Sequence, residues 1–176
     1  TSGDLVACKL GKSLDLDGGD DYVSLTDYSR LSFATDDFTL SLWASTTSLT
    51  LNYFVSKYET TNDRWYARLD AGGRLQFYNM VAGTARIQMY PSTVVGLDSG
   101  QWGHIVFASD RDASNYIYKN GQALTLGTNV TYTSAVSPNI DFRLGSYNTD
   151  GFLGQLDEFR YAKKVFSPER IETEYN

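Results

Sequence analysis

The chain of 176 residues has little of several residue types, and each shortage excludes a class of protein. Its single cysteine, Cys8, excludes an internal disulfide and therefore a disulfide-stapled scaffold. Its single histidine, His104, excludes a multi-histidine metal site. No apolar run approaches the roughly 20 residues that a membrane-spanning helix needs. We therefore expect no membrane insertion, and we expect His104 to be a strand residue with one ring nitrogen hydrogen-bonded.

Positive charge is also scarce. The chain has 15 Lys and Arg against 21 Asp and Glu, which gives a net charge of -6. The longest basic run is Lys163-Lys164. Proteins that bind a nucleic-acid backbone or an anionic membrane surface usually carry basic patches. We therefore expect no nucleic-acid partner.

Aromatic residues and glycine are plentiful by comparison. Aromatics make up 14% and hydrophobic residues 41% of the chain, and 15 Gly stand against 3 Pro. This composition is typical of a globular protein with many tight turns, and the length suffices for a sizeable core. We expect one domain over residues 1–176, as a module of a larger protein.

Apolar and polar residues alternate along most of the sequence, which is the pattern of half-buried strands. In the segment 65–69, for example, Trp65, Ala67 and Leu69 alternate with polar or amphipathic residues. Turn signals such as Asn120-Gly121 separate the strand-like runs. A single short helix is expected near the C-terminus, with Ser167 as its N-cap. The sequence thus predicts an all-β fold, an antiparallel two-sheet β-sandwich or jelly roll with one short C-terminal helix.

Six segments follow one another in an order that is specific for one fold. They are SLDLDGGDDYVSL (13–25), FTLSLWAS (38–45), WGHIVFASD (102–110), YIYKNGQAL (116–124), FRLGSYN (142–148) and GFLGQLDEFRYAKKVFSPERI (151–171). In this order they resemble the laminin-G-like domains of the concanavalin A-like lectin/glucanase superfamily. The resemblance implies one convex and one concave sheet, and a non-catalytic module for carbohydrate or protein recognition. It also implies a location that is extracellular, at the cell surface or at a virion surface.

The same resemblance implies a structural calcium ion that ties the first Asp-Gly turn to the C-terminal strand. Its ligands would be Asp17, Asp157, a backbone carbonyl near Gly18, and Asp20 or Asp21. Calcium prefers six to eight hard oxygen ligands, which carboxylates and turn carbonyls supply. The alternative is that these carboxylates cap turns or are solvated.

A ligand surface is predicted on the polar side of the middle strands. Sugar recognition uses flat aromatic faces for stacking and planar amide or guanidinium groups for hydroxyl pairs. The candidates of this kind are Tyr66, Arg68, Gln76, Tyr78, Arg86 and Gln88, with Tyr147 from a loop. The alternative is an ordinary solvated sheet face, because Tyr and Arg also suit strands.

Trp43 is a further ligand candidate, because its alternation places it away from Phe38 and Leu42. A tryptophan on a polar face is either a stacking platform or is covered by another segment. Tyr53, Tyr58 and the stretch 59–64 are candidates for the rim of a site, because exposed Tyr, Asn and Asp in loops are common in sugar and protein sites. The alternative is an ordinary loop, which uses the same residues.

Catalysis is not expected. Glycoside hydrolysis requires two carboxyl groups that flank the scissile bond, and no strand carries the Glu-x-Asp-x-x-Glu run that glycosidases of the fold this chain resembles place on one concave strand. Asp157 and Glu158 are adjacent, so in a regular strand they point to opposite faces. We therefore expect a lectin-like module that binds a polysaccharide or cell-surface glycan, with neighbouring domains of the same polypeptide as further candidate partners. The alternative is a protein–protein interaction or structural module of an adhesin or viral tail or fibre protein.

Overall fold

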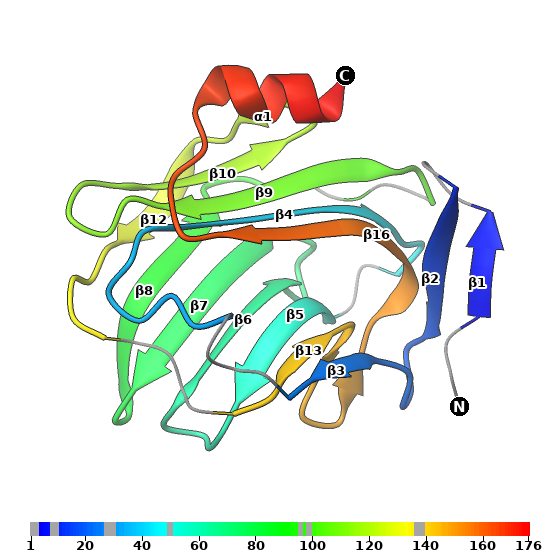
Figure 1. Ribbon diagram of the computed structural model, residues 1–176, viewed down its shortest axis with the longest axis horizontal. Coiled ribbons are helices and arrows are strands. Elements are labelled where there is room, and N and C mark those ends of the chain that lie inside the picture. Colours follow the sequence, from blue (N-terminus) through cyan, green and yellow to red (C-terminus); the bar gives the residue numbers. More distant parts are fainter. Residues whose placement is uncertain are drawn as a thin grey trace.

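The protein is a sandwich of two seven-stranded antiparallel sheets with one short helix on its outer side (Figure 1). The computed structural model describes residues 4–7, 11–26, 31–48, 51–94, 97, 100–135 and 140–176, so the single cysteine lies outside the described residues. The all-β, two-sheet prediction with a C-terminal helix is confirmed.

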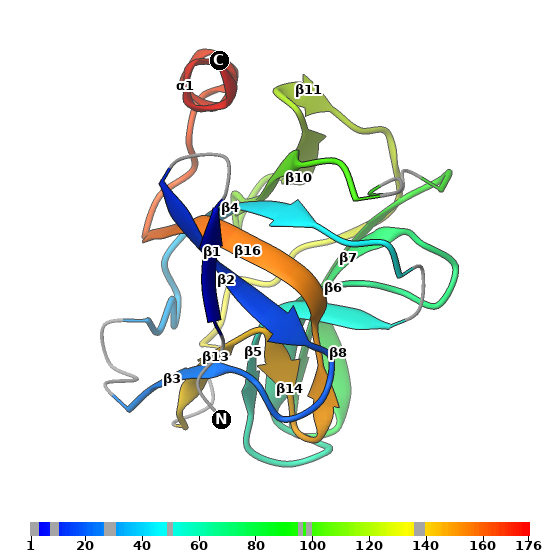
Figure 2. The same cartoon turned by 90° about the vertical axis from the view of Figure 1, so that its right-hand side faces the viewer.

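The first sheet lies next to the helix and contains both the first and the last strand of the chain. Its strands, in spatial order, are β1 (Asp4–Ala7), β2 (Lys12–Asp17), β16 (Leu153–Ala162), β4 (Phe38–Ser45), β9 (Gly103–Ser109), β10 (Asn115–Lys119) and β11 (Gln122–Ala123). The N-terminal β2 and the C-terminal β16 are hydrogen-bonded neighbours, as Figure 2 shows. The sandwich is therefore closed by segments that are more than 130 residues apart in the sequence.

The second sheet forms the opposite layer. Its strands, in spatial order, are β12 (Leu126–Val130), β8 (Thr84–Pro91), β7 (Leu75–Val81), β6 (Arg64–Leu69), β5 (Asn52–Tyr58), β13 (Phe142–Leu144) and β3 (Val23–Leu25). A small hairpin of β14 (Ser146–Tyr147) and β15 (Asp150–Gly151) lies against β5. This hairpin carries Tyr147 onto the outer side of the second sheet.

The core lies between the two sheets and is rich in aromatic rings. Phe38 stacks on Phe33 with ring centroids 4.3 Å apart, and Phe77 stacks on Trp65 at 5.8 Å. All four side chains are fully buried. Burying one such side chain stabilises the fold by about 1.5–3 kcal/mol, so this cluster fixes the alternation of strands β4, β6 and β7. The opposite side of each of these strands must then face outward.

The helix α1 (Pro168–Tyr175) covers the outer side of the first sheet (Figure 1). Ser167 accepts a hydrogen bond from the backbone N–H of Arg170, as the sequence predicts for an N-cap. Ile171 is the buried residue of the helix and packs in a cluster with Val106, Tyr118 and Phe166. The helix is thus held by an apolar contact of its own, separate from the main core.

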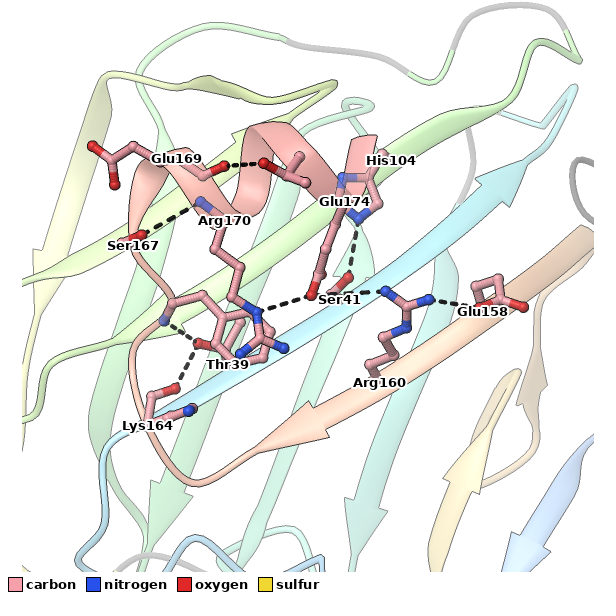
Figure 3. A network of polar contacts seen from close by, with 12 residues as sticks. Thr39, Ser41, His104, Glu158, Arg160, Lys164, Ser167, Glu169, Arg170 and Glu174 are labelled. Carbon is pink, nitrogen blue, oxygen red and sulfur yellow. Dashed lines mark hydrogen bonds and ion pairs between the residues drawn. The ribbon is translucent and has the colours of Figure 1, made fainter. Parts of the chain in front are cut away.

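A polar network surrounds this apolar contact (Figure 3). The Thr39 hydroxyl donates to the carbonyl of Lys164 at 2.7 Å and accepts from the N–H of Phe166 at 3.0 Å. Glu174 accepts from Arg170 at 3.0 Å. Its carboxylate also lies 3.7 Å from Arg160 of β16. These contacts attach the helix and the segment before it to β4 and β16.

Candidate functional site

Five tyrosines gather on the outer side of the second sheet. This surface, here called the tyrosine face, consists of Tyr53, Tyr58, Tyr66, Tyr78 and Tyr147. Tyr66 lies at its centre because its strand neighbours Trp65 and Ala67 are fully buried in the core. The alternation of β6 therefore turns Tyr66 outward, and the β14–β15 hairpin brings Tyr147 over it.

The rings of the tyrosine face pack closely on one another. Tyr66 stacks on Tyr78 with centroids 5.4 Å apart, and Tyr147 stacks on Tyr53 at 4.6 Å. Tyr147 also meets Tyr66 edge-on at 5.1 Å and Tyr58 edge-on at 5.0 Å. Such pairs contribute about 0.5–1.5 kcal/mol each beyond their area burial. The cluster is therefore a fixed platform rather than a set of independent side chains.

Arg68 links the polar side chain of Gln76 to the rings of the tyrosine face. Its Nε donates to Oε1 of Gln76 at 2.8 Å and its Nη1 donates to the hydroxyl of Tyr53 at 2.7 Å. The guanidinium also lies 4.6 Å from the ring centroid of Tyr66, within the range of a cation–π contact. The planar guanidinium and amide groups are thus held at a defined place beside the aromatic rings.

Burial keeps the hydroxyls of this face neutral. Burial is the main cause that raises the pKa of Tyr66, and the nearby Arg68 partly opposes it. Burial likewise raises the pKa of Tyr147 well above its ordinary value. Desolvation disfavours the charged phenolate, so both hydroxyls remain able to donate hydrogen bonds at physiological pH.

The structure brings most of the predicted ligand residues together. Tyr66, Arg68, Gln76 and Tyr78 lie side by side on β6 and β7, with Tyr147 above them. Gln88 of β8 is the register partner of Tyr78 and continues the row.

Sequence reasoning missed part of this surface. Tyr53 and Tyr58 were expected in rim loops but belong to β5. Arg64 was expected in the rim stretch 59–64 but is the first residue of β6, and its place two residues before Tyr66 gave a signal that could have put it on the sheet face.

Arg86 does not join the tyrosine face. A bulge between β7 and β8 pairs Met80 with Ala85, whereas Tyr78 pairs with Gln88. The strand alternation therefore shifts by one residue, and Ala85 takes the outward place that the sequence pattern gave to Arg86. The Arg86 guanidinium lies 4.6 Å from the ring centroid of Tyr132 instead. The expected regular alternation of 85–90 is wrong at this point.

Trp43 lies on the other side of the molecule, beneath the C-terminal helix. Its side chain is 5% exposed and stacks on Tyr175 of α1 at 5.8 Å, with His104 at 5.2 Å. Of the two alternatives for this tryptophan, the structure shows the covered one, and the cover is a helix. Trp43 therefore shares no surface with Tyr66 and its neighbours.

His104 is buried in the same place. Its Nε2 lies 3.0 Å from the Ser41 hydroxyl (Figure 3), which agrees with the expectation of one bonded ring nitrogen. Burial lowers the pKa of His104 to about 4, against a smaller opposing effect of Glu174. The imidazole is therefore neutral at physiological pH.

Three carboxylates converge at the turn that follows β2. Oxygen atoms of Asp17, Asp20 and Asp21 lie within 4.8 Å of one another. Gly18 at this turn has φ +82°, which a side chain would strain. Calcium binds oxygen ligands at 2.3–2.6 Å, so oxygens less than about 5 Å apart can share one ion. The donor type and spacing of these three residues therefore fit a calcium ion.

Asp157 lies apart from these carboxylates, contrary to the expected ligand set. The β2–β16 register pairs Asp17 with Leu153, which is four residues before Asp157. Four residues of strand span about 13 Å. Asp157 lies opposite Trp43 at a bulge of β16, and its Oδ1 accepts from the backbone N–H of Glu158. The strands are neighbours as expected, but their register separates the carboxylates.

An open groove adjoins the acidic turn on the outer side of the first sheet. Its volume is about 950 Å³. Its lining includes Asp15, Asp17, Asp21, Ser45 and Gln155, so it is mostly polar. Several of these groups are already bonded within the protein, since the Ser45 hydroxyl donates to the carbonyl of Gly100 at 2.8 Å.

The fold is shared with solved structures of low sequence identity. Domain 4 of AbnA, an extracellular GH43 arabinanase from Geobacillus stearothermophilus in complex with arabinotriose, has a TM-score of 0.72 and 20% identity over 100% of this chain and 82% of that chain. The CBM40 of a Ruminococcus gnavus IT-sialidase, bound to alpha2,3 sialyllactose, has a TM-score of 0.72 and 13% identity over 93% of this chain and 96% of that chain.

A third solved structure is much longer than this chain. The binding domain of Paraclostridial Mosquitocidal Protein 1 has a TM-score of 0.76 and 17% identity over 100% of this chain, which spans 46% of it. No curated protein sequence matches the chain. Within the described residues, no helix has the length and apolar character to cross a membrane.

A family model supplies the sequence relationship. A laminin G model, described as the Concanavalin A-like lectin/glucanases superfamily, matches residues 17–172. The match includes the whole second sheet, the first sheet from the last residue of β2 onward, and most of α1. This span is most of the sequence, and the two-sheet jelly roll agrees with it, so the chain belongs to the Concanavalin A-like lectin/glucanases superfamily.

Proposed function

We propose that the chain is a non-catalytic carbohydrate-binding module that recognises a polysaccharide or cell-surface glycan through the tyrosine face. The observation that carries this proposal is the fixed arrangement of Tyr66, Tyr78 and Tyr147 with the polar pair Arg68 and Gln76. Aromatic rings stack on the C–H faces of sugars, and planar polar groups bind their hydroxyls.

The polar groups of this face suit sugar hydroxyls in particular. Gln76 accepts from Arg68 through Oε1, which leaves its Nε2 as a donor. The neutral Tyr147 hydroxyl supplies another donor. Donors and acceptors held beside an aromatic platform are the usual form of a ligand site, and a shallow site of this kind gains strength when several modules act together.

The same face lacks the groups for hydrolysis. The described strands β5, β6, β7 and β8 contain neither Asp nor Glu. Two carboxyl groups on either side of the bound glycosidic bond are needed for glycoside cleavage by the usual route. A glycan on the tyrosine face would therefore be held and released unchanged.

Calcium is proposed as a structural ion at the acidic turn. Asp17, Asp20 and Asp21 would supply carboxylate oxygens, and the backbone near Gly18 would supply a carbonyl. Such an ion would offset the repulsion of three carboxylates in one turn. It would brace the fold where the acidic turn contacts β16 and the β14–β15 hairpin.

The solved relatives support a binding role. The arabinanase domain was solved in complex with arabinotriose, and the sialidase module was solved bound to alpha2,3 sialyllactose. By extension, we propose that this chain is secreted or lies at a cell surface or a virion surface, where such glycans occur. Neighbouring domains of the same polypeptide would then be the parts that the module tethers.

The direct test is a glycan-array screen of the wild-type chain and of Tyr78→Ala. Loss of this ring removes the stacking partner of Tyr66. We expect affinity for the selected glycan to fall about tenfold, which corresponds to about 1.4 kcal/mol. Tyr116→Ala is the matched control, since Tyr116 is a 38% exposed tyrosine on β10 of the other sheet.

Two results would contradict the proposal. Equal loss in Tyr78→Ala and Tyr116→Ala would remove the tyrosine face from the binding site. Absence of binding to every glycan, together with a mass that rises with protein concentration, would favour the protein-interaction alternative.

A further inference from the structure

Charge is distributed unequally between the two sheets. The chain carries a net charge of -6. The described strands of the first sheet contain the carboxylates Asp4, Asp15, Asp17, Asp157 and Glu158. The seven strands of the second sheet contain no carboxylate side chain at all, but they contain the basic residues Lys57, Arg64, Arg68, Arg86 and Arg143. Lys57 is fully buried and Arg86 lies away from the tyrosine face, so Arg64, Arg68 and Arg143 are the basic residues of these strands beside it.

Three arginines elsewhere in the described chain have carboxylate partners, whereas Arg111 bonds backbone carbonyls and Arg86 lies over the ring of Tyr132. Arg74 pairs with Asp70 at 2.8 Å, and Arg160 pairs with Glu158 at 2.9 Å. Arg170 pairs with Glu174 at 3.0 Å. An arginine with a nearby carboxylate has its charge compensated within the protein.

The arginines beside the tyrosine face have no such partner. Among the described residues, Arg64, Arg68 and Arg143 form no ion pair with a carboxylate. Nε of Arg64 is buried and has no hydrogen-bond partner in the described part of the chain. A desolvated donor on a cationic group is costly when it is left unpaired. The charge of Arg64 is therefore uncompensated among the described residues, and its terminal Nη atoms, which are not among the buried unpaired atoms, are the ones that an external anion could reach.

The positions of these arginines match the aromatic platform. Arg64 and Arg68 flank Tyr66 two residues to either side on β6, which places their Cα atoms about 13 Å apart. The Arg64 guanidinium lies 5.9 Å from the ring centroid of Tyr78. Arg143 faces Ser56 across the sheet, and Ser56 in turn faces Tyr66. A saccharide stacked on the tyrosines would meet a guanidinium at each end of the β6 row.

We infer that the glycan recognised by the tyrosine face is acidic, a saccharide with carboxylate or sulfate groups that Arg64 and Arg68 bind. This inference rests on the proposed function and names its ligand class. Arginine suits these anions because its planar fork can donate two parallel hydrogen bonds to one carboxylate or sulfate. Arg68 already uses Nε and Nη1 within the protein, so it contributes Nη2, whereas Arg64 can offer Nη1 and Nη2 but not its buried Nε.

The experiment compares acidic and neutral polymers by isothermal titration. The probes are polygalacturonate as the carboxylated polymer, dextran sulfate as the sulfated one, and dextran and linear arabinan as neutral ones. We expect binding to polygalacturonate or dextran sulfate at least tenfold tighter than to either neutral polymer. The preferred polymer then shows which anion the site takes. Added salt should weaken this binding, because it screens exposed charge pairs.

Variants then test whether Arg64 and Arg68 supply the positive charge that binds the acidic polymer. Arg64→Gln and the double variant Arg64→Gln/Arg68→Gln should lose tenfold or more in affinity for the acidic polymer. Lys163→Gln is the matched control, since it removes one positive charge from an exposed pair at the end of the other sheet. Melting temperatures check that each variant is folded, and Arg64→Gln alone keeps the Arg68 contacts that pack Tyr53.

The possible failures are distinguishable. Tyr78-dependent binding of neutral polymers with no preference for acidic ones would overturn the acidic-glycan inference and leave the proposed function standing. Acidic binding that Lys163→Gln weakens as much as Arg64→Gln would also overturn it, because the charge effect would not be local. Binding of no polymer of either kind would overturn the proposed function itself.

Discussion

The most unusual ionisable residue is His104, which is buried as a neutral imidazole between the first sheet and the C-terminal helix. Ser41 bonds its Nε2, Trp43 and Tyr175 lie against its ring, and Glu174 and Arg160 are the charged groups that act on it. Its pKa falls from 6.5 to about 4 in the folded protein. The unfolded chain therefore binds a proton more readily than the folded one between these pH values.

This pKa shift predicts a loss of stability in acid. The contribution of neutral His104 is fully present above pH 6.5, declines as the pH falls, and is lost below about pH 4. One pKa unit corresponds to 1.36 kcal/mol, so the loss is on the order of 3 kcal/mol. Urea unfolding of the wild type and of His104→Gln across pH 4–7 measures it. We expect the variant to show a shallower decline, and parallel curves for the two proteins would contradict the prediction.

At the scale of the elements, the helix α1 is the part whose removal should be most visible. Ile171 is fully buried against Val106 and Phe166, so Ile171→Ala should destabilise the protein by about 2–5 kcal/mol. Chemical denaturation at pH 7 measures this change. Thr173→Ala, at an exposed position of the same helix, is the control and should cost much less.

Deletion of residues 167–176 should expose Trp43 to water. The tryptophan fluorescence is then expected to shift to longer wavelength, because Tyr175 no longer covers the indole. Trp43→Phe identifies the source of the signal, since the shift should vanish when the deletion is made in that variant. An unchanged spectrum with intact far-ultraviolet circular dichroism would mean that another segment covers Trp43.

The elements also show how far the sequence could predict the site. The alternation of Trp65, Ala67 and Leu69 was enough to predict that Tyr66 and Arg68 face outward, because side chains in a regular strand alternate with a strict period of two. Arg86 was misplaced because a bulge adds one residue to a strand and leaves no clear mark in the sequence. The cover over Trp43 could not be predicted, because it depends on how the C-terminal helix packs. The position of Asp157 could not be predicted either, because it depends on the β2–β16 register. Both are set by contacts between segments that are distant in the sequence.

At the scale of the whole molecule, the acidic turn lies where the N-terminal and C-terminal strands meet the rest of the sandwich. Gly151 of the β14–β15 hairpin lies so close to this turn that an added Cβ would be 2.6 Å from the backbone of Gly18. The turn that carries Asp17 and Asp21 therefore contacts both β16 and the hairpin that holds Tyr147. An ion bound here would stabilise the closure of the sandwich and, through the hairpin, the tyrosine face.

Calcium should therefore raise the melting temperature of the metal-free protein. An ion at 100 times its dissociation constant stabilises the folded state by about 2.7 kcal/mol, which corresponds to about 5–10 °C for a chain of this size. Asp17→Asn and Asp21→Asn should abolish the shift, because each removes a carboxylate of the cluster. Asp157→Asn should preserve it, since the register places Asp157 about 13 Å further along β16. Thermal scans in EDTA and in excess calcium measure all four proteins. A shift that disappears only in Asp157→Asn would move the ion to the bulge of β16, whereas no shift in the wild type would leave the three carboxylates as solvated groups of a turn.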